Sequence, residues 1–139
     1  MGIAENKQTV LTFIQGMSKD PAVWDSMAEN AEWWIQGKGT ISKAEIRAIA
    51  QGGIGGMVTS AQMFIDHVTA EDNRVAVEAH SEIAMTDGRL FENTYHFLFV
   101  LDDEGKIVSG REHFDTGYAR DFFGAEAQDA VIAGAKAGT

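Results

Sequence analysis

The sequence predicts an α+β fold in which helices come first and an antiparallel sheet follows. Apolar residues recur at helical spacing through the first third of the chain. From Met63 onward, four alternating segments separated by turn residues replace that pattern. Helices followed by a run of strands indicate a sheet with its helices on one face. A curved sheet covered in this way on its concave face leaves a cone that can hold a small ligand.

Composition limits the class of protein. The 139 residues suit a single domain, 1–139, and 45% of them are hydrophobic. Acidic residues outnumber basic ones by 21 to 11, for a net charge of −10, which disfavours nucleic acid and anionic membranes as partners. There is no cysteine, so thiolate chemistry and disulfides are excluded. Without a signal-like or membrane-spanning apolar run, we expect a cytoplasmic protein.

The helical part divides into three segments. Apolar positions from Ile3 to Met17 share one helical face, and the pair Asp20-Pro21 predicts an N-cap before a short second helix that buries Val23, Trp24 and Met27. Residues 31–36 are aromatic and predict a strand. Ser42 and Glu45 form a capping box, so a third helix begins near Ser42 and stops in the glycine run 52–56.

Four strands and a short helix complete the prediction. Alternating apolar residues predict strands at 63–69, 74–85, 90–101 and 107–116. The Asp87-Gly88 pair is typical of a hairpin turn. Residues 118–123 predict a last amphipathic helical turn, and the Ala- and Gly-rich tail after Gly124 is expected to fray, so the ordered core is about 3–124.

Three strands carry polar residues that suggest chemistry. In 74–85, His80 and Glu82 share a face opposite the valines, which by itself is typical of a solvated outer face. In 90–101, Asn93 and Tyr95 share a face with two phenylalanines, as at a pocket rim or in a hydrogen-bonded core pair. In the last strand, Glu112 is the one carboxylate on an otherwise apolar or small face. Burial there raises a carboxyl pKa toward neutrality and suits a general acid or base, unless an arginine pairs with it.

The run GRLFENTYHFLFVLDDEGKIVSGREHFDTGYARDFFG, with RVAVEAHSEI and AEWWIQGKG before it, resembles the SnoaL-like branch of the NTF2-like superfamily. The resemblance covers about residues 5–124 and implies a cone-shaped, curved antiparallel sheet whose concave face is covered by N-terminal helices. Members include ketosteroid isomerases, polyketide cyclases, dehydratases, limonene-type epoxide hydrolases and non-catalytic domains. It also implies that no cofactor is needed and that two copies often dimerise through the outer sheet face.

Comparison with the epoxide-hydrolase branch implies a set of pocket residues. Its pocket arginine and aspartate fall at His80 and Glu82, which turns that face inward, and its last-strand aspartate falls at Glu112. Its apolar pocket positions fall at Asn93, Tyr95 and Phe114. The residues that hold its attacking water are replaced here by Trp33 and Ile35, which argues against epoxide hydrolysis.

These residues lead to a working hypothesis of cofactor-independent proton transfer. The catalytic set is His80, Glu82, Glu112 and Tyr95, and the substrate-binding set is Trp33, Ile35, Asn93, Phe97 and Phe114. Glu112 acts as the base, His80 relays a proton, and Tyr95 with Asn93 donates to a developing oxyanion. A small, mostly apolar, cyclic or aromatic oxygenated molecule suits such a pocket, in an isomerase, cyclase, dehydratase or lyase.

Two alternatives from other classes stay open: a ligand-binding module without catalysis, and a scaffold subunit of a larger complex. We expect no metal, because the histidines, including His96 and His113, show no ligand spacing such as HExxH. Asp115 faces away from the pocket by strand alternation, although a strand end can turn it back.

Overall fold

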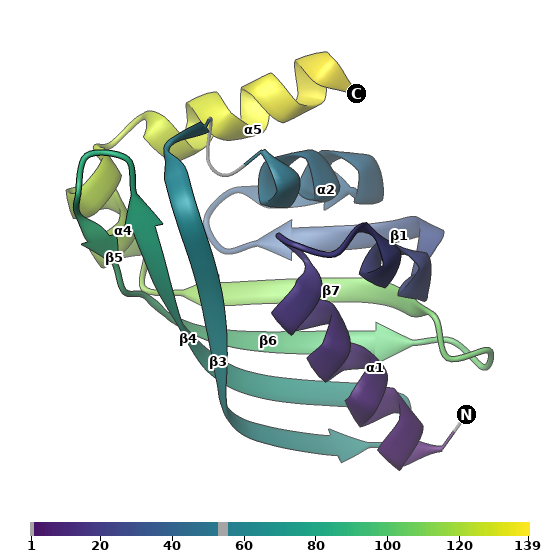
Figure 1. The fold of residues 1–139 in the computed structure, drawn as a ribbon. Helices are drawn as coiled ribbons and strands as arrows, with labels where there is room; N and C mark the ends of the chain where they lie inside the picture. Colours follow the sequence, from purple (N-terminus) through teal and green to yellow (C-terminus); the bar gives the residue numbers. More distant parts are fainter. Residues whose placement is uncertain (1, 53–55) are drawn as a thin grey trace.

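The computed structural model describes residues 2–52 and 56–139, which form one curved sheet with helices on its concave side (Figure 1). The strands are β1 (Met27–Ile35), β2 (Gly39–Ser42), β3 (Val58–Glu71), β4 (Arg74–Met85), β5 (Leu90–Phe91), β6 (Thr94–Leu101) and β7 (Ile107–Phe114). The helices are α1 (Ile3–Gly16), the short 3₁₀ helix η1 (Pro21–Ser26), α2 (Lys43–Gln51), α4 (Thr116–Phe123) and α5 (Ala127–Gly138). The predicted α+β class is confirmed.

The sheet has the order β2-β1-β7-β6-β4-β3, with β5 paired to β4. The predicted antiparallel meander is correct for β3, β4, β6 and β7. One pairing differs, because β1 runs parallel to β7, with Trp33 opposite Gly110 and Ile35 opposite Glu112. After β2 the chain crosses by α2 to β3 at the opposite edge and returns strand by strand. The last strand therefore arrives beside the first, running in the same direction.

Side-chain caps begin two of the helical segments as predicted. The Ser42 hydroxyl accepts from the Glu45 N–H at 3.1 Å and the Glu45 carboxylate accepts from the Ser42 N–H at 2.8 Å, which starts α2 at Lys43. The Asp20 carboxylate accepts from the Ala22 N–H at 3.0 Å. The segment that follows is a 3₁₀ helix, and Met27 begins β1 instead of ending a helix. Gly52 caps α2, and the rest of the predicted stop, 53–55, lies outside the described residues.

The two ends of the chain are both helical, and one prediction for them is wrong. At the N-terminal end Ile3, in the first turn of α1, is exposed. The tail after Gly124 is not frayed: residues 127–138 form α5, which packs on α2 and α4. Alanines and glycines carry little helical signal, but contact with α2 and α4 stabilises this helix, and Ile132 packs against the hydrophobic core.

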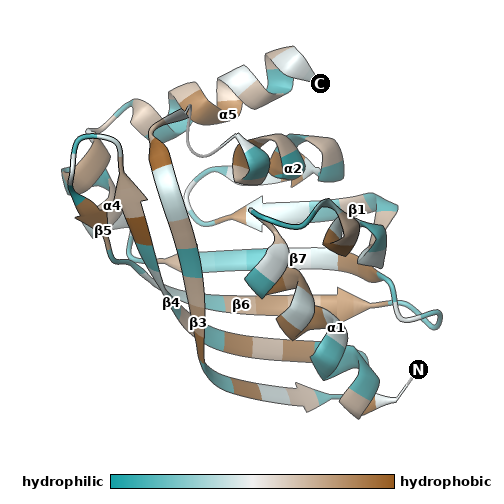
Figure 2. Cartoon of the chain, in the orientation of Figure 1, coloured by the Kyte–Doolittle hydropathy of each residue, from teal (hydrophilic) through white to brown (hydrophobic). Residues whose placement is uncertain are grey.

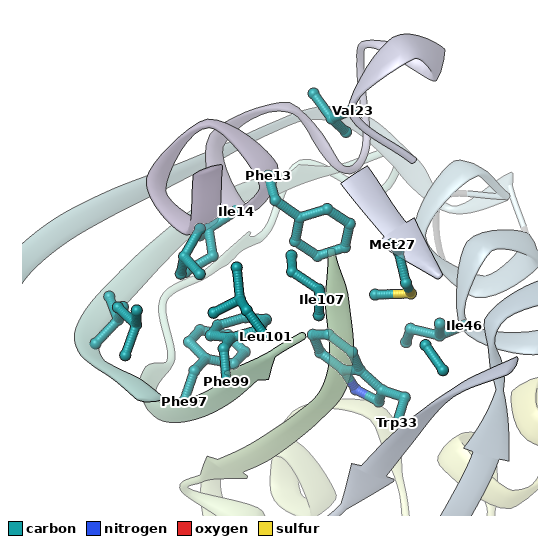
Figure 3. Packing of buried hydrophobic residues seen from close by; sticks show 14 of the residues in the cluster. Phe13, Ile14, Val23, Met27, Trp33, Ile46, Phe97, Phe99, Leu101 and Ile107 are labelled. Carbon is teal, nitrogen blue, oxygen red and sulfur yellow. The ribbon is translucent and has the colours of Figure 1, made fainter. Parts of the chain in front are cut away.

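The core lies between α1 and the concave face of the sheet, where apolar side chains alternate with polar ones along the strands (Figures 2 and 3). The Phe13 ring meets Trp24 edge-on, with ring centroids 5.0 Å apart, and Trp33 packs against Phe99 at 5.8 Å. Gly110 is required below Trp33, because a Cβ there would lie 2.5 Å from the indole ring. Trp33 can therefore lie flat across β7 and reach the neighbouring Glu112.

Candidate active site

A pocket of about 560 Å³ opens at the end of the cone away from α1, between the sheet and helices α2, α4 and α5. The sheet contributes its floor, in which Ile35, Tyr95, Glu112 and Phe114 lie. Helices α4 and α5 contribute the opposite wall through small and apolar residues such as Ala119, Phe123 and Val131. The volume and the mostly apolar lining suit a small organic molecule.

Among the described residues that line this pocket, Glu112 is the only carboxylate. Its carboxylate accepts a hydrogen bond of 3.0 Å from the Trp33 indole N–H. Burial raises the pKa of Glu112 to about 7, and the Trp33 hydrogen bond opposes that rise. The ion pair with an arginine that the sequence left open is not found among the described residues. The neighbouring Arg111 guanidinium lies 4.1 Å from the Trp34 ring centroid instead.

Tyr95 lies on β6, next to β7, and its ring stacks on Phe97 with centroids 5.5 Å apart. Its hydroxyl is 2.9 Å from the hydroxyl of Ser81, a residue with no exposed surface. The Ser81 hydroxyl in turn accepts from the Asn93 N–H at 3.3 Å. Burial raises the pKa of Tyr95, with nearby Glu112 contributing in the same direction, so the phenol keeps its proton. When Ser81 donates to the Tyr95 oxygen, that proton is free to point into the pocket.

Asn93 is buried and its amide is held by backbone groups. Its Nδ2 donates to the Asp115 carbonyl at 3.1 Å, and its Oδ1 accepts from the Thr94 N–H at 2.8 Å. The structure therefore combines the two interpretations of this residue, since Asn93 lines the pocket and is also a hydrogen-bonded core residue. Asp115 caps α4 through the Tyr118 N–H at 3.0 Å and is not among the residues that line the pocket.

His80 and Glu82 are not brought together with Glu112, and the prediction that they face the pocket is wrong. Along β4 the side chains of Val75, Val77, Ala79 and Ser81 are buried, so their alternate neighbours lie on the outer face. His80 stacks on Phe64 there, with ring centroids 4.9 Å apart, and its Nδ1 is 2.8 Å from the Asp66 carboxylate. Strand alternation by itself places this face correctly, and the comparison with the hydrolases does not.

Glu82 is exposed and borders a second hollow, about 610 Å³, between the end of α1 and strands β3 and β4. Of the other predicted site residues, Ile35 and Phe114 line the Glu112 pocket, whereas Trp33 and Phe97 lie behind its surface. Trp33 acts on the site through Glu112, and Phe97 through its stacking on Tyr95.

Three residues of the site escaped the sequence analysis. Ser81 could have been predicted from the sequence, because it lies two residues after the buried Ala79 and therefore on the same face of β4. Arg120 lines the pocket four residues after Thr116 and three before Phe123, a spacing that places all three on one side of α4. Gln36 follows the end of β1, where alternation no longer indicates direction, and its Oε1 accepts from the Phe114 N–H at 3.0 Å.

In the described part of the chain, no three potential metal ligands gather in one place, and no helix is long and apolar enough to cross a membrane. The site thus combines a carboxyl group whose pKa is raised to about 7 with a phenol that keeps its proton, in an apolar pocket of a curved-sheet α+β protein.

The sequence pattern of the SnoaL-like domain matches residues 12–110, so this chain belongs to the SnoaL-like domain family. None of the curated proteins compared with it matches by sequence. Among solved structures, a candidate SnoaL-like polyketide cyclase from Jannaschia sp. CCS1 is similar, with a TM-score of 0.73 at 19% identity, over 88% of this chain and 94% of that one.

Two further solved structures have the same fold. An NTF2-like protein from Burkholderia pseudomallei gives a TM-score of 0.69 at 20% identity, over 87% of this chain and 97% of that one. An LEH-like epoxide hydrolase from M. tuberculosis gives 0.71 at 17% identity, over 83% and 86%. At these identities the likeness concerns the fold, and the expected NTF2-like architecture is confirmed.

Proposed function

We propose that this protein is a cofactor-independent acid–base enzyme of the isomerase, cyclase, dehydratase or lyase type. Its substrate is a small, mostly apolar, cyclic or aromatic molecule with a carbonyl oxygen. The observation that carries the proposal is Glu112, a carboxyl group titrating near neutrality that lines the same apolar pocket as the protonated Tyr95. A purely structural carboxylate in such a place is typically stabilised by a cation partner, whereas the one side chain that bonds Glu112 in the described part of the chain is Trp33.

The shared chemical step is enolisation. The Glu112 carboxylate removes a proton from the carbon next to the carbonyl, and the C–H electron pair moves to form an enolate. Tyr95 donates a hydrogen bond to the oxygen on which charge develops, and Ser81 supports it by donating to the phenol oxygen. Glu112, now protonated, returns its proton to the same carbon in exchange or to another carbon in isomerisation. The apolar walls limit the water that reaches the enolate.

Mass spectrometry in D₂O, in the presence of a chelator, tests this proposal. The panel contains 2-tetralone, β-hydroxy aromatic ketones, polyphenolic β-carbonyl compounds and epoxides, each incubated with wild type, Glu112→Gln and Glu82→Gln. We expect deuterium uptake or loss of water with wild type and Glu82→Gln, and a loss of roughly a hundredfold or more in Glu112→Gln. Glu82→Gln is the matched control, because that carboxylate is exposed on β4.

Other outcomes separate the remaining classes. Turnover that survives in Glu112→Gln keeps the enzyme class but overturns the assignment of the base. Gain of water in an epoxide would indicate a hydrolase. Compounds that bind without any change in wild type, with only a modest change of affinity in Glu112→Gln, would overturn catalysis in favour of a ligand-binding module.

A further inference from the structure

The charges that line the Glu112 pocket differ from those of the whole chain. Acidic residues outnumber basic ones by 21 to 11 in the sequence. The pocket lining reverses this excess, with Lys38 and Arg120 against the single carboxylate Glu112. Lys38 comes from the turn between β1 and β2, and Arg120 from α4, so two separate segments place cations on the walls around the sheet floor.

Arg120 is the cation available to a ligand. Lys38 is already paired, with its Nζ 2.7 Å from the Asp129 carboxylate of α5. The other four arginines each have a side-chain partner: Gln51 for Arg47, Glu71 for Arg74, Asp87 for Arg89 and the Trp34 ring for Arg111. Within the described residues, the Arg120 guanidinium is not engaged by any side chain or carbonyl. It is exposed, while its stem lies on the pocket side of α4.

A second donor lines the same pocket. The Gln36 Oε1 accepts from the Phe114 N–H at 3.0 Å, which fixes the orientation of the amide. Its NH₂ group, which no other residue engages in the described chain, is therefore left as a donor on the pocket wall. A guanidinium and an amide NH₂ group can donate hydrogen bonds but cannot accept them. Such groups bind anionic oxygen atoms well.

We propose that the substrate carries an anionic oxygen group, a carboxylate or an ionised enol or phenol, and that Arg120 binds this group at the pocket mouth with Gln36 as the second donor. The inference rests on the proposed function and names its substrate class. The apolar body of the molecule then lies between α4 and the sheet, with its carbonyl toward Tyr95. Binding the anion on α4 keeps it on a different wall from Glu112 on β7, which limits repulsion between the two negative charges.

Isothermal titration calorimetry with two matched probes tests the inference. The probes are 2-naphthoate and 2-acetonaphthone, which share one ring system and differ in charge. The variants are Arg120→Gln, Arg120→Lys and the control Arg47→Gln, which changes a half-buried arginine of α2 that does not line the pocket. We expect wild type to bind naphthoate about tenfold more tightly than the ketone. Arg120→Gln should lose about that tenfold for naphthoate and less than about twofold for the ketone.

Two further results are expected. Arg120→Lys should keep part of the preference, because it retains the charge without the two-pronged geometry. Arg47→Gln should bind both probes as wild type does. Equal losses for both probes in Arg120→Gln, unchanged naphthoate affinity in that variant, or no naphthoate binding by wild type would each overturn the inference.

Failure of the anionic-substrate inference can be distinguished from failure of the proposed function. Deuterium exchange into 2-tetralone depends on Glu112 and needs no anionic group. If exchange disappears in Glu112→Gln but Arg120→Gln weakens the binding of both probes equally, the proposed function is supported and the anionic substrate is overturned. If naphthoate binding depends on Arg120 but no compound exchanges deuterium, the anion site is supported and the proposed enzymatic activity is overturned.

Discussion

Glu112 is an ordinary residue type whose surroundings change its chemistry. Its neighbours across the sheet are Ile35 and Phe97, so little water and no cation stabilises the ionised form. The single donor is the Trp33 indole, which lies over Gly110 and reaches the carboxylate at 3.0 Å. The pKa near 7 therefore depends on the balance between apolar packing and one hydrogen bond.

The pH dependence of turnover follows from that balance. Because the base must be ionised, kcat/KM for deuterium exchange should rise with pH up to about 7 and then level off. The raised pKa of Tyr95 leaves no falling limb below pH 10 from this phenol. Trp33→Phe removes the indole donor, so the rising limb should move to higher pH. Initial rates across pH 5 to 9 would check this, and an unmoved limb in that variant would contradict it.

The raised pKa of Glu112 should also affect stability: the free energy of unfolding should fall over the pH range in which turnover rises. The folded pKa of Glu112, about 7, lies above the value of 4.5 for a free side chain, so wild type loses stability as pH rises between these values. Glu112→Gln removes this loss and should unfold with a free energy up to roughly 3 kcal/mol higher than wild type at pH 8, with little difference at pH 4. Urea denaturation at both pH values gives the comparison. Equal stabilities at pH 8 would argue against a buried carboxylate.

At the scale of elements, β7 is the strand on which the site depends. It pairs in parallel with β1 and antiparallel with β6, and so places Glu112 between Ile35 and Phe97. Its alternation was readable from the sequence, and so were the capping box of α2 and the buried face of β6. Helix α5 was not, because its weakly apolar residues gain their stability from contact with α2 and α4.

Gly110 offers a test of the β1–β7 contact. Gly110→Ala places a Cβ 2.5 Å from the Trp33 ring, so either the indole or the strand must move. We expect a loss of roughly 2–3 kcal/mol in the free energy of unfolding, as for other overpacked cores. Gly134→Ala is the control, since nothing lies within 4 Å of its Cβ position in α5. That variant should be stabilised by about 0.5–1 kcal/mol. Thermal denaturation compares both variants with wild type.

At the scale of the whole molecule, the outer sheet face remains to be explained. The His113 ring lies 4.9 Å from Trp34, and its Nδ1 is buried without a hydrogen-bond partner among the described residues. Half-buried Leu98 lies between these aromatic groups and β4 on the same face. Unpaired polar atoms and apolar side chains on an outer surface are typical of a surface that meets a second molecule.

We expect the protein to form a homodimer through this outer face. Leu98→Glu introduces a charge at the centre of the face and should give a monomer with an unchanged circular dichroism spectrum. Glu104→Gln, in the exposed turn between β6 and β7, should leave the dimer intact. Light scattering coupled to size-exclusion chromatography measures both. A wild-type protein that stays monomeric at high concentration would refute the dimer.

The sequence by itself determined much of the local structure: the four strands β3, β4, β6 and β7, where α2 begins, that Asn93 and Tyr95 share one face, and that Glu112 lies on the apolar face of its own strand. These features follow from alternation and capping, which act between residues close in the chain. Only the tertiary structure decided that β1 runs parallel to β7 and that α5 forms one wall of the pocket. It also placed Arg120 opposite the sheet floor. Such features depend on packing between segments far apart in the sequence, which no local pattern records.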